Sequence, residues 1–374
     1  MTHIRLTSWN IKELDEVLNG TRPAEVARRA AIAEQILALD ADILCILEAS
    51  RDLAALRRFV TQELADQYEI AILPGTDEVL ALADEAEKWR ELTRLYGLPN
   101  RKKSAGGPAA QWIWFLVRRS LNAAPRLLSP RVFDEFARAQ FEDAEDRDRD
   151  DGRWIVYWWQ GETPVKHRHD RHPQVLQLTL AGKPVEIIGC HLKSKINQAK
   201  VERNPDGSLT GPYLRTATQA RGKLASEAVH VRKYIDARFA QEPDPLIFVV
   251  GDLNDGPGKE FFERKYMLFD LISNLQGSIF EARKYLNHAL FDYEGELRWS
   301  YFLHGKDKVD PDRDPKVLLD HILFTQGLVD KTSLPRVEPG AGKVEHLIHD
   351  TINAMRPKDP TSDHKPVSCM IRVA

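Results

Sequence analysis

Residues 248–258 read FVVGDLNDGPG, and this stretch carries the most informative pattern in the chain. The apolar run from Ile247 to Val250 predicts a strand buried on both faces. It leads directly into Asp252 and Asn254, a carboxylate and a carboxamide. A simple turn rich in Asn, Asp, Gly and Pro would also fit these letters. Buried polar groups need a partner, however, so the pattern suggests that a cation or a reacting water lies in front of the strand.

Other predicted strands end in polar residues in the same way. The strand-ending stretches and their polar residues are LTSWN with Asn10, ILCILE with Glu48, IIGCH with His191 and VLLDH with Asp320. The stretch TSDHKPV, with Asp363 and His364, precedes the last strand. The ends of neighbouring strands lie along one rim of a sheet, where α/β proteins place their sites. We therefore expect these side chains to meet in one cluster.

The residue types in this set suit phosphoester hydrolysis. Carboxylate and amide oxygens are ligands that Mg²⁺ prefers, an Asp or His can act as base for a water, and imidazolium and amide groups can donate to charge developing on phosphorus. Pairing Asp320 with His364 would hold the imidazole tautomer and raise the pKa of His364. Taken singly, Asn10 also suits a turn, Glu48 a helix cap and His191 a core position.

Composition limits the class of protein. The chain has 374 residues, with 53 basic and 56 acidic side chains and a net charge of −3, so any phosphate binding must be local. Three cysteines argue against a disulfide framework, and no apolar run reaches the roughly 18 residues of a membrane span. The N-terminus MTHIRLTSWN lacks the pattern of a signal peptide, so we expect a cytoplasmic protein.

Periodicity predicts many strands and few long helices. Helices are expected at about 22–38, 51–66, 79–95 and 213–241, and strands at 4–10, 42–48, 111–119, 153–160, 174–180, 184–192, 247–252, 298–303, 316–324 and 365–373. We find no linker that divides the chain. This predicts a single domain over residues 1–374, with insertions near 76–108, 135–152 and 306–316.

The ordered set of motifs resembles the endonuclease/exonuclease/phosphatase superfamily. The stretches that carry this resemblance run from end to end of the chain: SWNI (8–11), ILCILE (43–48), GCHLKS (189–194), VVGDLND (249–255), LLDHILF (318–324) and TSDHKPV (361–367). The resemblance implies an α/β fold, a four-layer α-β-β-α sandwich with two mostly antiparallel packed sheets flanked by helices. It also implies hydrolysis of phosphodiesters with Mg²⁺ or Mn²⁺ as cofactor.

The same resemblance assigns roles to residues of this chain. Glu48 looks like the principal metal ligand, with Asn10 and Asp363 beside it. Asp252 looks like the residue that positions or deprotonates the attacking water, helped by Asn254, and His191 looks like a donor to the scissile phosphate. His364, oriented by Asp320, looks like a phosphate contact or a general base. Which of Asp252 and His364 is the base stays open.

Three functions remain at this point. The first is a nuclease acting on DNA or RNA, for which Lys193, Lys195 and Arg221 are candidate phosphate contacts. The second is a hydrolase of small or lipid phosphoesters, and the third is a scaffold without catalysis. The sequence does not predict the oligomeric state.

Three other motifs do not support a functional assignment. Pro257 excludes a nucleotide-binding phosphate loop at 251–259, and adjacent Ser362, Asp363 and His364 lack the geometry of a serine triad. His167, His169 and His172 could bind zinc but suit a charged loop better.

Overall fold

The computed structural model describes residues 2–96, 111–133, 136, 153–156, 165–169, 171–195, 200–257, 260–267, 270–305, 309–310, 312–330, 332–356 and 358–374. The predicted insertion at 135–152 lies outside these residues except for Phe136, and those at 76–108 and 306–316 are described only in part.

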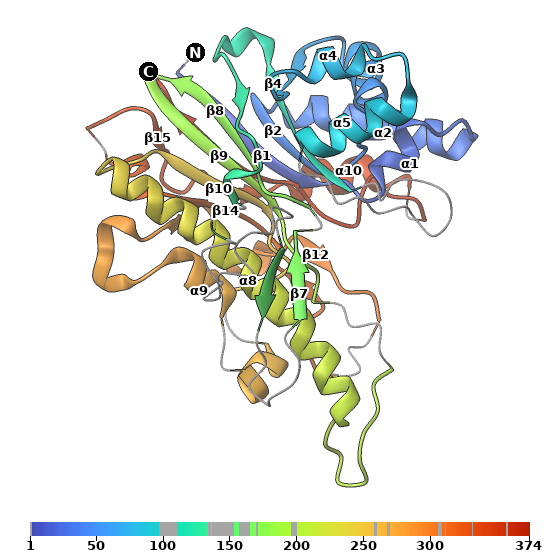
Figure 1. Cartoon of the computed structure of the whole chain (residues 1–374), viewed down its shortest axis with the longest axis vertical. Helices are drawn as coiled ribbons and strands as arrows, with labels where there is room; N and C mark the ends of the chain where they lie inside the picture. The colour runs from blue at the N-terminus through green and yellow to red at the C-terminus, as the bar shows by residue number, and fades with distance from the viewer. Residues whose placement is uncertain are drawn as a thin grey trace.

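Two large mixed sheets form the centre of the molecule (Figure 1). The first contains, in spatial order, β15 (Arg336–Val337), β17 (Val367–Arg372), β1 (His3–Asn10), β2 (Ile43–Ala49), β4 (Trp112–Arg118) and β3 (Tyr68–Ile70), with β16 (Lys343–Val344) also paired to β17. The second contains β11 (Asn287–His288), β14 (Asp320–Phe324), β10 (Ile247–Asp252), β9 (Lys183–His191), β8 (Gln174–Leu180) and β5 (Arg126–Leu127). Separate hairpins are β6 (Arg153–Val156) with β7 (Val165–Arg168) and β12 (Tyr301–Phe302) with β13 (Lys316–Val317).

Helices cover the outer faces of both sheets (Figure 1). Those on the side of the first sheet are α1 (Leu14–Leu18), α2 (Pro23–Leu39), α3 (Leu53–Glu63), α4 (Thr76–Leu80), α5 (Glu85–Leu95) and α10 (His346–Asn353). The second sheet carries α8 (Gly211–Gln241) and α9 (Leu271–Gln276). Short 3₁₀ or π helices are η1 (Arg119–Leu121), η2 (Glu263–Met267), η3 (Ile279–Lys284), η4 (Gly295–Leu297) and η5 (Gln326–Leu328).

This arrangement confirms the predicted four-layer sandwich. In each of the two sheets one described pair is parallel, β1 with β2 and β9 with β10, and the other described pairs are antiparallel. The first and last long strands, β1 and β17, pair with each other, and the chain ends lie close together (Figure 1). Within the described residues, none of the helices combines the length and apolarity that crossing a bilayer requires.

The core is divided by the alternation of side chains along the strands. Ile187 and Phe248 pack between the sheets, whereas their neighbours Ile188 and Val249 pack beneath α8 and α9. A strand with apolar residues on both faces therefore appears in the sequence as one continuous apolar run. At Gly189 the sheets approach so closely that a Cβ would lie 2.9 Å from the sulfur of Cys45.

Some predicted elements are shorter than expected. The helix predicted over 79–95 is two helices, because Asp84 caps α5 by accepting a hydrogen bond from Glu87 N. The strand predicted at 298–303 is reduced to β12, and the one at 316–324 is divided into β13 and β14. The strand predicted at 153–160 is described only as β6.

Candidate active site

Strand register brings three of the predicted residues together. Asp252 lies opposite His191 in the parallel pair of β10 with β9, and opposite Asp320 in the antiparallel pair of β10 with β14. The His191 Nε2 to Asp252 Oδ2 distance is 3.6 Å. Gly251 precedes Asp252 at φ 132°, where a Cβ would lie 1.9 Å from the Cys190 carbonyl oxygen, so only glycine fits here.

The first sheet contributes Asn10 and Glu48 from the ends of β1 and β2. These strands are parallel neighbours, so their C-terminal ends lie at the same edge. Glu48 has a left-handed φ of 55° beside an irregularity in the pairing of β2 with β4, and its Oε2 accepts a hydrogen bond of 3.1 Å from Glu13 N. A glutamate in this conformation is strained, and such strain is concentrated at functional sites.

The loop before β17 is tied to the end of β1 by Ser362. Its hydroxyl donates to the Asn10 carbonyl at 2.6 Å and accepts from the backbone N–H groups of Lys12 at 3.1 Å and His364 at 3.2 Å. The Lys12 ammonium lies 3.4 Å from Asp363. Ser362 thus acts as a structural anchor that places Asp363 and His364 beside Asn10.

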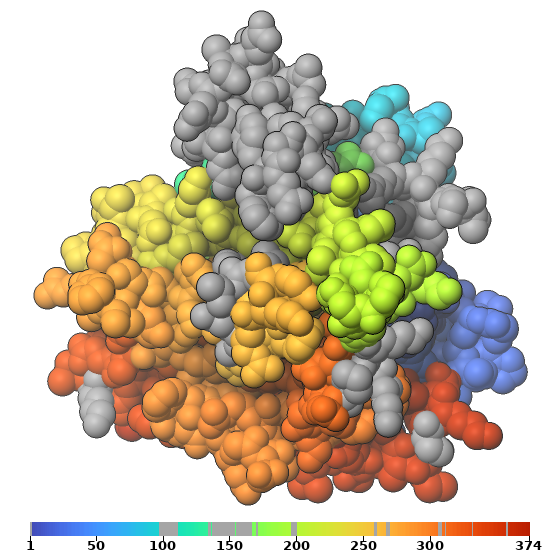
Figure 2. Space-filling view, turned by 90° about the horizontal axis from the view of Figure 1, so that it is seen from below, coloured from blue at the N-terminus to red at the C-terminus, as the bar shows by residue number. Residues whose placement is uncertain are grey.

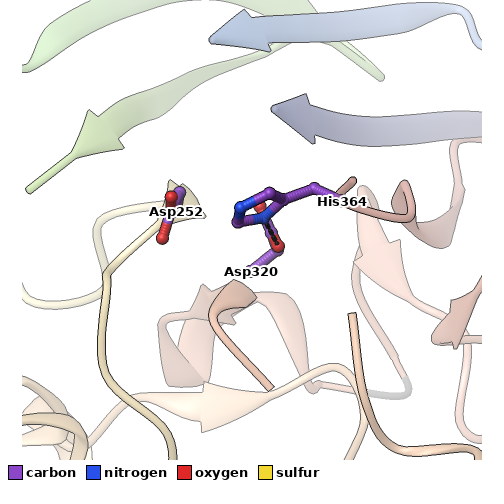
Figure 3. A group of neighbouring side chains, drawn as sticks. All are labelled: Asp252, Asp320 and His364. Atoms are coloured by element: carbon purple, nitrogen blue, oxygen red, sulfur yellow. Dashed lines mark hydrogen bonds and ion pairs between the residues drawn. The ribbon is translucent and has the colours of Figure 1, made fainter. Parts of the chain in front are cut away.

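The predicted pairing of Asp320 with His364 is confirmed. The His364 Nδ1 to Asp320 Oδ2 distance is 2.8 Å, and the other side of the imidazole faces Asp252 (Figure 3). Ligand atoms of these three residues all lie within 4.8 Å of one another. The Ser300 hydroxyl accepts the Asp320 backbone N–H at 3.0 Å, and the Tyr301 ring packs on the imidazole with centroids 4.8 Å apart.

Burial and charge set distinct protonation states for these groups. Burial alone would lower the pKa of His364, but Asp320, followed by Asp252, outweighs it and raises that pKa to about 10. Burial raises the pKa of Asp252 to about 7, against the opposing effect of His364. Burial, with Arg171 and His364 adding to it, lowers the pKa of His191 well below its usual value. At neutral pH His364 is therefore cationic and His191 is neutral.

The amides around Asp252 are already oriented. Asp252 accepts a hydrogen bond of 2.8 Å from Asn254 N and one of 3.0 Å from Asn10 Nδ2. Asn254 Nδ2 donates to the Leu192 carbonyl at 2.9 Å. Because the amide nitrogen of Asn10 is turned to Asp252, its buried Oδ1 is left without a partner among the described residues. An orphaned carbonyl oxygen at this position is a suitable ligand for a cation.

One cleft of about 940 Å³ contains most of the predicted set. Its lining includes Asn10, Glu48, His191, Asp252, Asn254, Asp363 and His364. Asp320 is fully buried and reaches the cleft only through His364. The side chains that the sequence places far apart therefore meet around one volume.

The candidate phosphate contacts are placed differently. Lys195 lines the cleft, but its ammonium lies 2.6 Å from Asp255 and 2.8 Å from Glu260. Arg221 also lines the cleft and pairs with Glu263 at 2.5 Å. Lys193 is not among the described residues that line the cleft. Ion pairing leaves Lys195 and Arg221 poorly placed to follow a polyanionic backbone.

Sequence reasoning missed Arg171, which lines the cleft beside His191. Its Nε donates to the His191 carbonyl at 3.0 Å, its Nη2 to the Leu192 carbonyl at 2.9 Å and its Nη1 to the Gln111 side chain. All three acceptors are neutral, and among the described residues no carboxylate forms an ion pair with Arg171. In the sequence Arg171 is only a basic residue shortly before a strand, and this pattern is too common to indicate a functional residue.

Two groups of residues compete as a metal centre. Asp252, Asp320 and His364 lie close enough together, but His364 is cationic and its Nδ1 is committed to Asp320. A bound cation there would face an imidazolium, which opposes binding. Asn10, Glu48 and Asp363 also line the cleft, and they offer oxygen donors only: two carboxylates, of which that of Asp363 lies 3.4 Å from the Lys12 ammonium, and the buried Asn10 oxygen without a described partner. This second set fits a hard divalent cation better.

Comparisons with known proteins agree with the motifs. The model of the Endonuclease/Exonuclease/phosphatase family matches residues 7–364, so the chain belongs to this family. Enzymes of this superfamily are divalent-metal-dependent phosphoesterases. No match was found among curated protein sequences.

Several solved structures are similar to the chain at low identity. Truncated TDP2 from Caenorhabditis elegans is 14% identical, with 99% of this chain and 97% of that chain covered and a TM-score of 0.47. D. rerio TDP2, complexed with single strand DNA product, is 13% identical, with 100% of both chains covered and a TM-score of 0.47. SmcL is 14% identical, with 99% of both chains covered and a TM-score of 0.49.

Proposed function

We propose that the chain is a single-domain phosphodiester hydrolase that uses Mg²⁺ or Mn²⁺. The observation that carries this proposal is the joint presence, in one cleft, of a buried Asp–His pair and a separate set of oxygen ligands. Asn10, Glu48 and Asp363 would hold the ion. When bound, the ion would neutralise charge on the phosphate and polarise its P–O bonds.

The protein groups divide the proton chemistry between them. Asp252 accepts a proton from the attacking water, which is supported by a pKa raised to about 7 by burial. His364 is cationic and donates to the phosphate, held by the Asp320 carboxylate at 2.8 Å. The neutral His191 offers one N–H to a second phosphate oxygen. On this division of roles, Asp252 and not His364 is the base.

Arg171 supports the binding of the anionic phosphate. Its guanidinium lies next to the His191 and Leu192 carbonyls and keeps N–H groups beyond those already used. Because the partners of Arg171 among the described residues are neutral, its guanidinium retains its attraction for an anion. Two classes of substrate are proposed, a nucleic acid and a small phosphoester.

The test is hydrolysis of bis(p-nitrophenyl) phosphate by the purified chain. We expect turnover with Mg²⁺ or Mn²⁺, none in EDTA, and weak turnover of the monoester p-nitrophenyl phosphate. His364→Ala should abolish turnover, while the control His3→Ala, at an exposed position, should retain it. Plasmid nicking under the same conditions tests the nucleic-acid version. Failure to hydrolyse any of these esters with either metal would overturn the proposal.

A further inference from the structure

Beyond the catalytic groups, the outer part of the cleft is lined by apolar side chains. They are partly exposed and belong to four separate segments: Val201, Phe261, Leu303, Val309, Val317 and Leu319. We call this set the apolar wall. Partly exposed apolar side chains that line a concave surface lose contact with water when an apolar group binds there.

The apolar wall is supported by a small core of its own. Residues 200–210 form an arm that leads into α8, and the N-terminal half of α8 extends beyond the sheets (Figure 1). Leu209 of the arm packs with Tyr213 and Ala217 of α8 and with Phe262. The arm and residues 260–267 lie side by side on one face of the molecule (Figure 2). Val201 and Val309 of the wall pack against this small core, so this part of the wall is held in place before a ligand arrives.

The charges of the cleft are nearly balanced. Its described lining contains six Lys and Arg side chains and six Asp and Glu side chains, and the cationic His364 adds one positive charge. Around the outer part, Arg313 pairs with Glu260 at 2.7 Å, and Glu260 also contacts Lys195. Arg221 pairs with Glu263 and lies 4.1 Å above the Phe262 ring. A site for a polyanionic strand needs a clear excess of basic groups, and the described part of this surface does not provide one.

From these observations we propose that the apolar wall binds an uncharged apolar or aromatic substituent of the phosphodiester. The proposal rests on the proposed function and specifies its substrate. The reaction centre takes one phosphate, and the wall takes the group attached to it. The substrate is then a single phosphodiester with an apolar arm. A strand with many phosphates would place its second phosphate against apolar side chains.

The experiment compares p-nitrophenyl phosphodiesters whose second arm is methyl, hexyl, phenyl or 5′-thymidyl. With Mn²⁺ present, we expect kcat/KM for the hexyl and phenyl esters to exceed that for the methyl ester at least about tenfold, mainly through KM. Preference for thymidyl over phenyl would identify a nucleobase as the natural arm, and preference for hexyl an aliphatic chain; both support the proposal. Equal values for methyl, hexyl and phenyl esters would overturn it, as would more efficient cleavage of a single-stranded oligonucleotide than of every ester.

Leu303→Gln provides the matched variant, because Leu303 belongs to the wall and its backbone N–H donates to the Pro315 carbonyl, outside the catalytic set. We expect the hexyl-to-methyl ratio of kcat/KM to fall towards one. Phe291→Gln is the control: Phe291 is 78% exposed and lies outside the described cleft lining, so its ratio should match the wild type. An unchanged ratio in Leu303→Gln contradicts the proposal. If no ester is cleaved by the wild type, the proposed function itself fails first.

Discussion

The inner and outer ends of the cleft use charged side chains in opposite ways. At the inner end, Asp252 is buried and its pKa is raised, so the protein keeps a carboxylate where it is costly. At the outer end, Lys195 and Arg221 are paired with carboxylates and stabilise the wall. Burial of Asp252 at the inner end therefore costs folding stability but makes the carboxylate a better base. The ion pairs at the outer end have a structural role.

The largest expected effect is on the rate at the inner end. Asp252→Asn should lower kcat for the methyl p-nitrophenyl ester about 10³-fold, because the attacking water loses its base. In EDTA at neutral pH the thermal midpoint should not fall and should rise slightly, since ionising a carboxylate whose folded pKa is raised costs stability above its unfolded pKa and Asp252→Asn removes that cost. Differential scanning calorimetry and steady-state kinetics measure both. A large fall in the midpoint would show that Asp252 is mainly structural.

Lys195→Met should lower the folding stability and leave the rate nearly unchanged, which is the reverse of the effect expected for Asp252→Asn. Removing the ammonium leaves Asp255 buried without its partner, which we expect to cost about 3 kcal/mol of folding free energy. Urea unfolding measures this, and kcat for the methyl ester should change little. The control is Lys284→Met, whose exposed pair with Glu281 should contribute almost nothing. If Lys195 bound phosphate instead, KM would rise without a loss of stability.

Glu48→Gln separates metal binding from folding. Loss of one carboxylate should raise the Mn²⁺ concentration that half-maximally increases the thermal midpoint at least about tenfold. This readout does not depend on activity. Glu78→Gln, at an exposed position, is the control and should leave the Mn²⁺ titration unchanged. Equal titrations for wild type and Glu48→Gln would exclude Glu48 as a ligand.

The last expected effect concerns the stability of the protein in acid. The β6–β7 hairpin is anchored on α8 by Trp154 Nε1, which donates to Ser226 Oγ at 3.0 Å, and by His169 Nε2 and His230 Nδ1, 3.1 Å apart. His169 and His172 are buried here, so the charged loop predicted for this segment is wrong: the rings pack among aromatic neighbours.

Burial lowers the pKa of His230 to about 3, with Lys233 and His172 adding to the effect. On acidification His230 therefore binds a proton near pH 6.5 in the unfolded chain, but only near pH 3 in the folded chain. The contribution of neutral His230 to the unfolding free energy is fully present above pH 6.5. It should fall by about 1.4 kcal/mol per pH unit as the pH decreases towards 4. His230→Gln should reduce the slope of unfolding free energy against pH, while His3→Gln should not. Identical slopes would contradict the stated cause.

The inner end was the more predictable region, for a physical reason. Asp252, His191 and Asp320 follow apolar runs, and strand register then forces them together. The left-handed φ of Glu48 was not predictable, because a bulge depends on the partner strand. The outer end depends on long-range contacts such as Lys195 with Glu260, which no local pattern encodes.

A crystal structure of the protein soaked with Mn²⁺ tests the central claim most directly. The account predicts one anomalous peak bounded by oxygen atoms of Asn10, Glu48 and Asp363, with His364 still bonded to Asp320. A peak among Asp252, Asp320 and His364, or no peak in the cleft at a Mn²⁺ concentration that supports turnover, would contradict it.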